Sequence, residues 1–115
     1  MSTLAEVQLE VISQMRRDYK GRDKMRVQSL CTAGLAEEAG EVNGLWKREL
    51  RDLPKDRARC TQVKYIEELG DVLWYLVAVA TLKGISLETI WNYNILKLEE
   101  RYADSCGTCS AGIEA

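Results

Sequence analysis

The sequence contains no histidine among its 115 residues, and this absence excludes several kinds of active site. Serine and cysteine nucleophiles of the histidine-activated type need an imidazole base, and di-iron carboxylate bundles need Glu-x-x-His pairs. A zinc site would have to consist of cysteine alone. The sequence also lacks a phosphate-binding loop of the form G-x-x-x-x-G-K-[ST]. Any phosphate chemistry in this chain would therefore rely on a metal ion.

Other features are scarce rather than missing. Proline occurs once and glycine eight times, so few positions interrupt a helix. The net charge of −2 argues against a general nucleic-acid surface. The longest apolar run, residues 72–82, includes Thr81 and is too short to span a membrane. The first fifteen residues contain Glu6 and Glu10 and do not resemble a signal peptide. We expect a cytoplasmic protein without nucleic-acid or membrane partners.

Four cysteines are present, and they are interpreted as free cytosolic thiols. The alternatives are a redox pair or a metal clip, for which the Cys106-x-x-Cys109 spacing would be the starting point. The other two cysteines are Cys31 and Cys60.

Apolar residues recur every three or four positions, and this spacing predicts four helices. The charged segment around Pro54 is expected to be a loop. Gly84 is expected to end the third helix and Ser86 to cap the fourth. These features predict an all-α, antiparallel four-helix bundle in one domain, residues 1–102, followed by a flexible tail, residues 103–115. The predicted helices cover residues 4–17, 26–50, 61–83 and 86–102.

Two acidic clusters lie where apolar helix faces are expected. Glu38 shares a stripe of the second predicted helix with three apolar residues, and Glu41 lies one turn further along the same side. Glu68 and Asp71 come immediately before the apolar run of the third. The roles of the neighbouring Glu37 and Glu67 stay open. The apolar members of the stripe are Leu35, Val42 and Leu45.

Carboxylates held together near a core repel one another unless protons or a cation compensate their charge. Neither cluster contains Arg or Lys. A hard divalent cation, Mg²⁺ with Mn²⁺ as a possible substitute, matches carboxylate oxygen ligands. Pairs on two facing helices can direct four carboxylates to one point. The alternative is an ordinary solvated acidic surface. The predicted metal ligands are Glu38, Glu41, Glu68 and Asp71.

The fourth predicted helix carries polar residues close to its apolar stripe. Asn94 lies within the stripe, and Lys97 and Arg101 follow along nearly the same line. Lys97 and Arg101 can bind phosphate oxygens, while Asn94 can hydrogen-bond a sugar or base. The alternative for the two cations is a favourable interaction with the dipole at the end of the helix.

Together these segments resemble a MazG-like nucleotide pyrophosphohydrolase, from the all-α NTP pyrophosphatase superfamily that also includes dimeric dUTPases. The resemblance extends over residues 28–102. Ala103 stands where this family often has proline, and the tail departs from the usual pattern. The motifs that carry the resemblance are LAEEAGEV at 35–42, EELGDVL at 67–73 and N-x-x-K-L-x-x-R-Y at 94–102.

The resemblance implies magnesium-dependent cleavage of the α–β phosphate bond of (deoxy)nucleoside triphosphates, giving a monophosphate and pyrophosphate, in house-cleaning of the nucleotide pool. It implies that the four acidic residues bind the metal and that Glu38 or Glu41 also orients or deprotonates the attacking water. It further implies a homodimer or homotetramer with sites near the subunit interfaces. The residues implied to hold the nucleotide are Asn94, Lys97 and Arg101.

Two other functions remain open from the sequence. A catalytically silent helical module would bind nucleotides without turnover, and a purely structural dimerisation bundle would bind neither metal nor nucleotide. A dUTPase-like enzyme with a narrow base preference is a third alternative, concerning the substrate alone. Trp46, Trp74 and Trp91 can stack on a base, but tryptophans at helical spacing are more often core residues.

Overall fold

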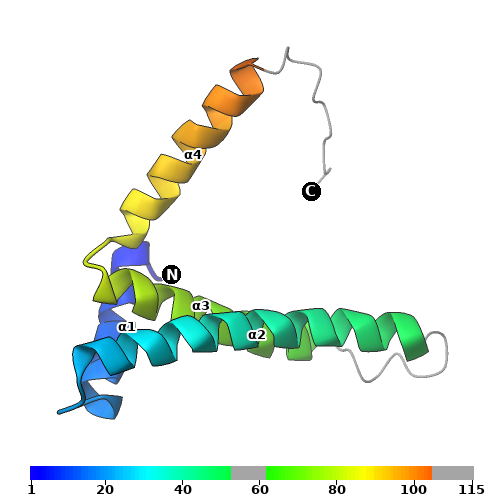
Figure 1. Ribbon diagram of the computed structural model, residues 1–115. Helices are drawn as coiled ribbons and strands as arrows, with labels where there is room; N and C mark the ends of the chain where they lie inside the picture. Colours follow the sequence, from blue (N-terminus) through cyan, green and yellow to red (C-terminus); the bar gives the residue numbers. More distant parts are fainter. Residues whose placement is uncertain (53–61, 105–115) are drawn as a thin grey trace.

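The computed structural model describes residues 1–52 and 62–104, which form four α-helices and no strand (Figure 1). The all-α prediction is therefore confirmed. The second and fourth helices extend about two residues beyond their predicted ends. The predicted loop after position 52, the predicted helix start at Thr61 and most of the predicted tail lie outside the described residues. The helices are α1 Leu4–Asp18, α2 Lys24–Asp52, α3 Gln62–Leu82 and α4 Leu87–Asp104.

Side-chain caps define three helix starts. The backbone N–H of Glu6 donates to the Thr3 hydroxyl over 3.1 Å at the start of α1. At the start of α2, the N–H of Arg26 donates to the Asp23 carboxylate over 3.1 Å. Ser86 accepts from the Thr89 N–H over 3.1 Å, so its predicted role as the cap of α4 is confirmed. Each cap satisfies a backbone donor that the first turn of a helix leaves without a partner.

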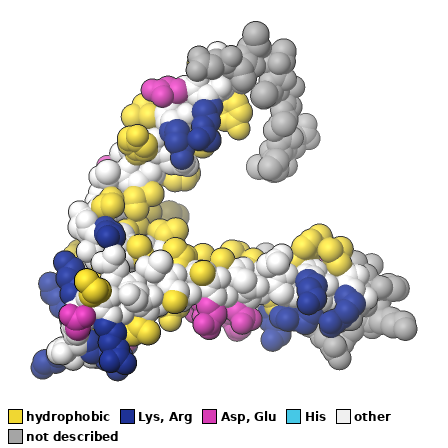
Figure 2. Space-filling view, in the orientation of Figure 1, with side chains coloured by type: hydrophobic (Ala, Val, Ile, Leu, Met, Phe, Trp, Pro, Cys, Tyr) yellow, Lys and Arg dark blue, Asp and Glu magenta, His cyan; other side chains and the backbone are white. Residues whose placement is uncertain are grey.

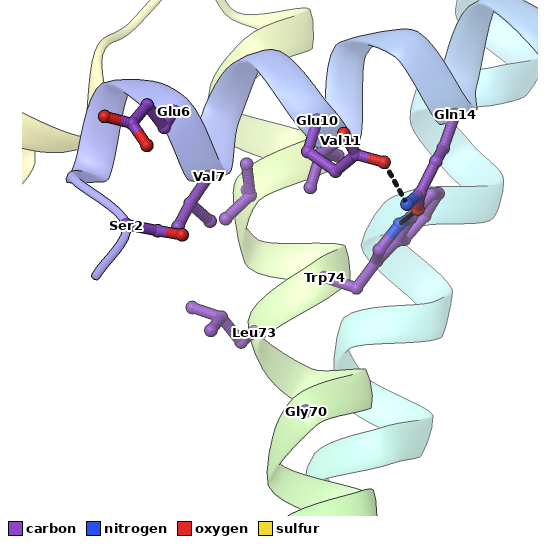
Figure 3. A pocket seen from close by; sticks show the side chains of 10 residues that line it. Ser2, Glu6, Val7, Glu10, Val11, Gln14, Gly70, Leu73 and Trp74 are labelled. Carbon is purple, nitrogen blue, oxygen red and sulfur yellow. Dashed lines mark hydrogen bonds between the residues drawn. The ribbon is translucent and has the colours of Figure 1, made fainter.

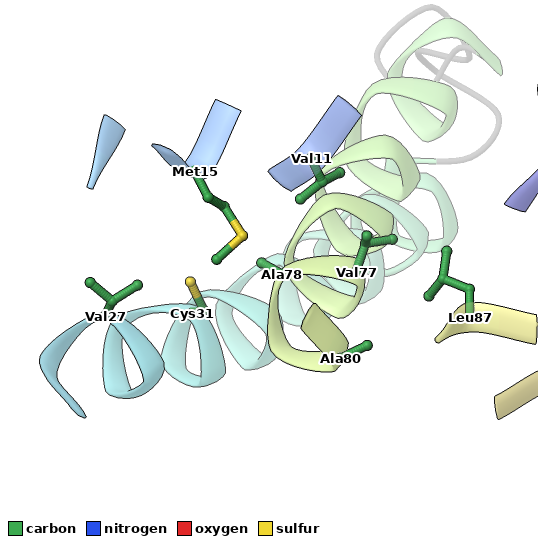
Figure 4. Packing of buried hydrophobic residues seen from close by; sticks show 8 residues of the cluster. All are labelled: Val11, Met15, Val27, Cys31, Val77, Ala78, Ala80 and Leu87. Atoms are coloured by element: carbon green, nitrogen blue, oxygen red, sulfur yellow. The ribbon is translucent and has the colours of Figure 1, made fainter. Parts of the chain in front are cut away.

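Helices α2 and α3 lie side by side, and α1 crosses them near one end (Figure 1). The main core lies at this crossing (Figure 4). Cys31 and Val77 are fully buried at its centre, and the Cys31 thiol is free, as predicted; the other three cysteines lie outside the described residues. Burial raises the pKa of this thiol, which keeps it in the unreactive protonated form. The other core residues are Val11, Met15, Val27, Ala78, Ala80 and Leu87.

Helix α3 ends in a tight turn built around Gly84. This residue has a φ of +70°, as expected for the predicted helix stop. The N–H of Gly84 donates to the Thr81 carbonyl over 3.0 Å, and the N–H of Ile85 donates to the Ala80 carbonyl over 2.9 Å. This pair of bonds is a Schellman motif, which ends a helix and redirects the chain.

Gln8 of α1 fixes the direction in which the chain leaves this turn. Its amide donates to the Thr81 hydroxyl over 3.1 Å and to the Ile85 carbonyl over 3.0 Å. Its side-chain oxygen accepts the N–H of Leu87, the first residue of α4, over 3.1 Å. One side chain therefore binds the end of α3, the turn and the start of α4.

The prediction of an antiparallel four-helix bundle is wrong for the single chain. Helix α4 bends by 99° relative to α3 and projects away from the α2–α3 pair, with its main helix contacts at α1 (Figure 1). The turn at Gly84 and the bonds of Gln8 impose this direction. As a result, the apolar stripe predicted for α4 is covered mainly at its start: Leu87 is buried, whereas Ile90 and Trp91 are exposed.

Within residues 1–52 and 62–104, no single helix is long and apolar enough to cross a membrane. Helices α3 and α4 together, with the sharp bend between them, meet that criterion by length and composition only.

Replacing Gln8 by Ala should lower the free energy of unfolding by about 1–2 kcal/mol, because three hydrogen bonds at the α3–α4 turn are lost. Denaturant unfolding followed by circular dichroism measures this change. Ser13→Ala, at an exposed position of the same helix, is the control and should change stability little. Equal unfolding midpoints for the two variants would contradict the role assigned to Gln8.

Candidate metal centre

Three of the four predicted metal ligands meet where α2 and α3 run side by side. One carboxylate oxygen from each of Glu38, Glu68 and Asp71 lies within 4.8 Å of the other two. Glu38 and Glu68 are half-buried, and Asp71 is exposed. Figure 2 shows acidic side chains gathered midway along this helix pair. The apolar stripe of α2 explains the position of Glu38, because Leu35 and Val42 on either side of it are also half-buried.

The electrostatics of Glu38 are those of a carboxylate among like charges. The pKa of Glu38 is raised, first by partial burial and then by the carboxylates of Asp71, Glu68, Glu37 and Glu41. Every group that shifts this pKa by its charge is therefore an acid. A proton or a bound cation would relieve this repulsion.

The donor set fits a hard divalent cation. The group consists of carboxylate oxygens only, which suit Mg²⁺ or Mn²⁺. Opposite ligands of an octahedral Mg²⁺ lie about 4.2 Å apart, so a spread of 4.8 Å requires only small side-chain adjustments.

The remaining acidic residues surround this group without joining it. Glu41 is exposed and lies outside the three-carboxylate group, although it is close enough to raise the pKa of Glu38. Glu37 is likewise an exposed neighbour of Glu38, and Glu67 is exposed on α3. Four carboxylates were predicted to converge on one point, and three of them do so in the structure.

The predicted nucleotide-binding residues lie on α4, apart from the carboxylates of their own chain. Asn94 is half-buried, while Lys97 and Arg101 are exposed. Asn94 and Lys97 line an open pocket of about 380 Å³ together with Trp91 and Tyr93. Because α4 turns away from α2 and α3, the single chain does not bring this pocket to the acidic cluster.

A second pocket, of about 410 Å³, lies between α1 and α3 (Figure 3). Trp74 forms part of its wall, and its indole N–H donates to the Gln14 side-chain oxygen over 2.6 Å. The core interpretation of the tryptophans holds for Trp74, which packs against the core, whereas Trp46 and Trp91 are 52% and 58% exposed. None of the four predicted metal ligands lines this pocket.

Most of the chain matches a known protein family. Residues 26–105 match the family model of the MazG nucleotide pyrophosphohydrolase domain. The chain belongs to this family. The match includes both acidic clusters and α4, so it contains every predicted site residue of this MazG chain.

The MazG chain is also similar to the Gene 37 protein of Mycobacterium phage L5. The two are 34% identical over 79 residues, which make up 69% of each chain. No solved structure matches the chain.

Sequence analysis missed two residues beside the cluster of this MazG domain. Gly34 lies one turn before Glu38 on α2, and Tyr75 lies one turn after Asp71 on α3. A Cβ atom added to Gly34 would overlap the Tyr75 ring, at 2.6 Å from Cζ. The helical spacing of Gly34 from Glu38 was visible in the sequence, but no sequence signal pairs it with Tyr75.

The raised pKa of Glu38 predicts how stability depends on pH without divalent cations. The folded protein holds the Glu38 proton more tightly than the unfolded chain does. The stabilisation of the fold that protonated Glu38 provides is therefore fully present below about pH 4. It is lost as the pH rises through the raised pKa of Glu38. In EDTA, Glu38→Gln should melt at a higher temperature than the wild type at pH 7, and this advantage should disappear near pH 4.

Thermal melts across this pH range test the prediction, with Glu67→Gln as a matched control for loss of one negative charge from the exposed surface. The pH profile of Glu67→Gln should follow the wild type. If the pH profile of Glu38→Gln were identical to that of the wild type, the neighbouring carboxylates would not destabilise ionised Glu38, and the prediction would be wrong.

Proposed function

We propose that this MazG-family protein is a magnesium-dependent nucleoside triphosphate pyrophosphohydrolase, acting in house-cleaning of the nucleotide pool. It cleaves the bond between the α- and β-phosphates and releases a nucleoside monophosphate and pyrophosphate. The observation that carries the proposal is the meeting of Glu38, Glu68 and Asp71 between two helices of a chain that belongs to this family.

In this proposal, the three grouped carboxylates and Glu41 hold Mg²⁺, with Mn²⁺ as a substitute. When bound, the metal supplies concentrated positive charge for the phosphate oxygens. Hydrolysis adds one water across the anhydride bond and releases a proton, which Glu38 or Glu41 accepts. Glu41 is suited to accept this proton because it is exposed and lies beside the group of three carboxylates without belonging to it.

Lys97, Arg101 and Asn94 hold the nucleotide in this proposal. Lys97 and Arg101 bind phosphate oxygens through their charge, and Asn94 hydrogen-bonds the sugar or base. The open pocket shared by Asn94 and Lys97 supports a binding role for α4. Its aromatic members, Trp91 and Tyr93, offer faces on which a base can stack.

We further propose that a second copy of the chain completes each site, in a homodimer or homotetramer. Large apolar side chains are left uncovered on α3 and α4: Leu69 and Leu73 are 52% and 51% exposed, and Trp91 and Leu96 are 58% and 60% exposed. Exposed apolar surfaces of this kind are typical of protein interfaces. A partner that covers them can bring its own Asn94 and Lys97 to the acidic cluster.

The catalytic proposal is tested by measuring pyrophosphate release from a panel of canonical and modified triphosphates. Release should require Mg²⁺ or Mn²⁺ and stop in EDTA. Glu38→Ala should lower the rate at least about 100-fold with unchanged helicity, because one ligand and one candidate base are lost.

Glu67→Gln, which removes a charge from the exposed face of α3, should remain active. Full activity of Glu38→Ala would refute the site assignment. Nucleotide binding without any turnover by the wild type would instead favour a silent nucleotide-sensing module.

Mixed oligomers test whether two chains share a site. Glu38→Gln and Lys97→Ala should each be inactive alone. In a co-expressed mixture, a site that combines Glu38 of one copy with Lys97 of another is intact, so activity should return to about a quarter of the wild-type value for a randomly mixed dimer. Differently tagged copies verify that mixing has occurred. Mixed oligomers without recovered activity would place both residues in one chain.

A further inference from the structure

Beside the acidic cluster, α2 packs against α3 through a glycine and an aromatic ring. A Cβ atom at Gly34 would lie 2.6 Å from Cζ and 2.7 Å from Cδ1 of Tyr75, well inside van der Waals contact. The ring therefore occupies the space that any larger residue at position 34 would need. Other helical glycines differ: a Cβ at Gly40 or Gly70 would meet no atom within 4 Å.

The Tyr75 ring belongs to a packed cluster of aromatic side chains. It packs edge-on against Trp74, with ring centroids 5.2 Å apart and planes at 82°. Trp74 is itself held by its hydrogen bond to Gln14 and by a tilted contact with Tyr19 at 6.4 Å. An added methyl group at Gly34 would therefore push on a packed aromatic cluster, and relieving the overlap would displace the ring or move the helices apart.

The same contact adjoins the carboxylates on both helices. Gly34 is one helical turn from Glu38, and Tyr75 is one turn from Asp71. The pKa of the Tyr75 hydroxyl is raised, first by burial and then by the nearby charge of Glu38. The Tyr75 hydroxyl thus lies near the group of carboxylates that the two helices bring together.

We propose that Gly34 and Tyr75 are a positioning pair, whose contact sets the distance between α2 and α3 at which Glu38 reaches Glu68 and Asp71. This inference rests on the proposed metal site. The requirement is strict because Mg²⁺ accepts oxygens only near 2.0–2.1 Å in octahedral geometry. A separation of the helices that moves Glu38 away from Glu68 and Asp71 would therefore weaken cation binding before it unfolded the protein.

The test compares cation affinity in two glycine variants of α2. Calorimetric titration with Mn²⁺ alone, in the absence of nucleotide, measures the affinity. Gly34→Ala should bind Mn²⁺ at least about tenfold more weakly than the wild type, with helicity retained. Gly40→Ala makes the same substitution in open space on the same helix and should bind Mn²⁺ as the wild type does.

A second-site variant separates helix spacing from general destabilisation. Gly34→Ala combined with Tyr75→Leu removes the ring that the new methyl group would meet, so it should recover affinity relative to Gly34→Ala. If Gly34→Ala does not fold, a double variant that folds and binds Mn²⁺ supports the same contact. Wild-type affinity in a folded Gly34→Ala, or no recovery in the double variant, would overturn the inference. Absence of Mn²⁺ binding by the wild type would instead refute the proposed metal site.

Discussion

The candidate site depends on holding like charges together against their repulsion. Glu38, Glu68 and Asp71 come from two helices, and nothing in their own charges favours their meeting. The helices are held by packing on both sides of the cluster. On one side is the main core around Cys31 and Val77. On the other side Leu45 is buried, and Tyr65 of α3 donates a hydrogen bond to Glu49 of α2 over 2.8 Å.

Local sequence signals predicted the helices well, because these signals act over one or two turns. Apolar spacing placed the described helix ends within about two residues, and Gly84 and Ser86 predicted the end of α3 and the start of α4. The same periodicity placed Glu38 on the inward side of α2. The caps at Thr3 and Asp23 follow the same rule and have the same residue types as sequence signals.

The direction of α4 was not predictable, because contacts between distant residues determine it. Gln8 binds Leu87 across 79 positions of sequence, and nothing in the pattern around Gln8 indicates that role. An apolar stripe shows that a helix face is to be buried against protein. It does not show whether the same chain or another copy provides the packing surface. The bundle prediction assumed cover within the chain. The close approach of Gly34 to Tyr75 was also not predictable, because it too is a contact between residues far apart in the sequence.

The separation between core and site explains how the fold tolerates an acidic cluster. Had the three carboxylates replaced core residues at the α1 crossing, each would have lost most of its hydration, at a cost of several kcal/mol per ion. They lie instead midway along the helix pair, where Asp71 remains exposed and Glu38 and Glu68 are only half-buried. Their repulsion is therefore softened by water, and a cation can reach them from solvent. A candidate site built this way can remain strained without a cation, since the residues that stabilise the fold are not the carboxylates proposed to bind it.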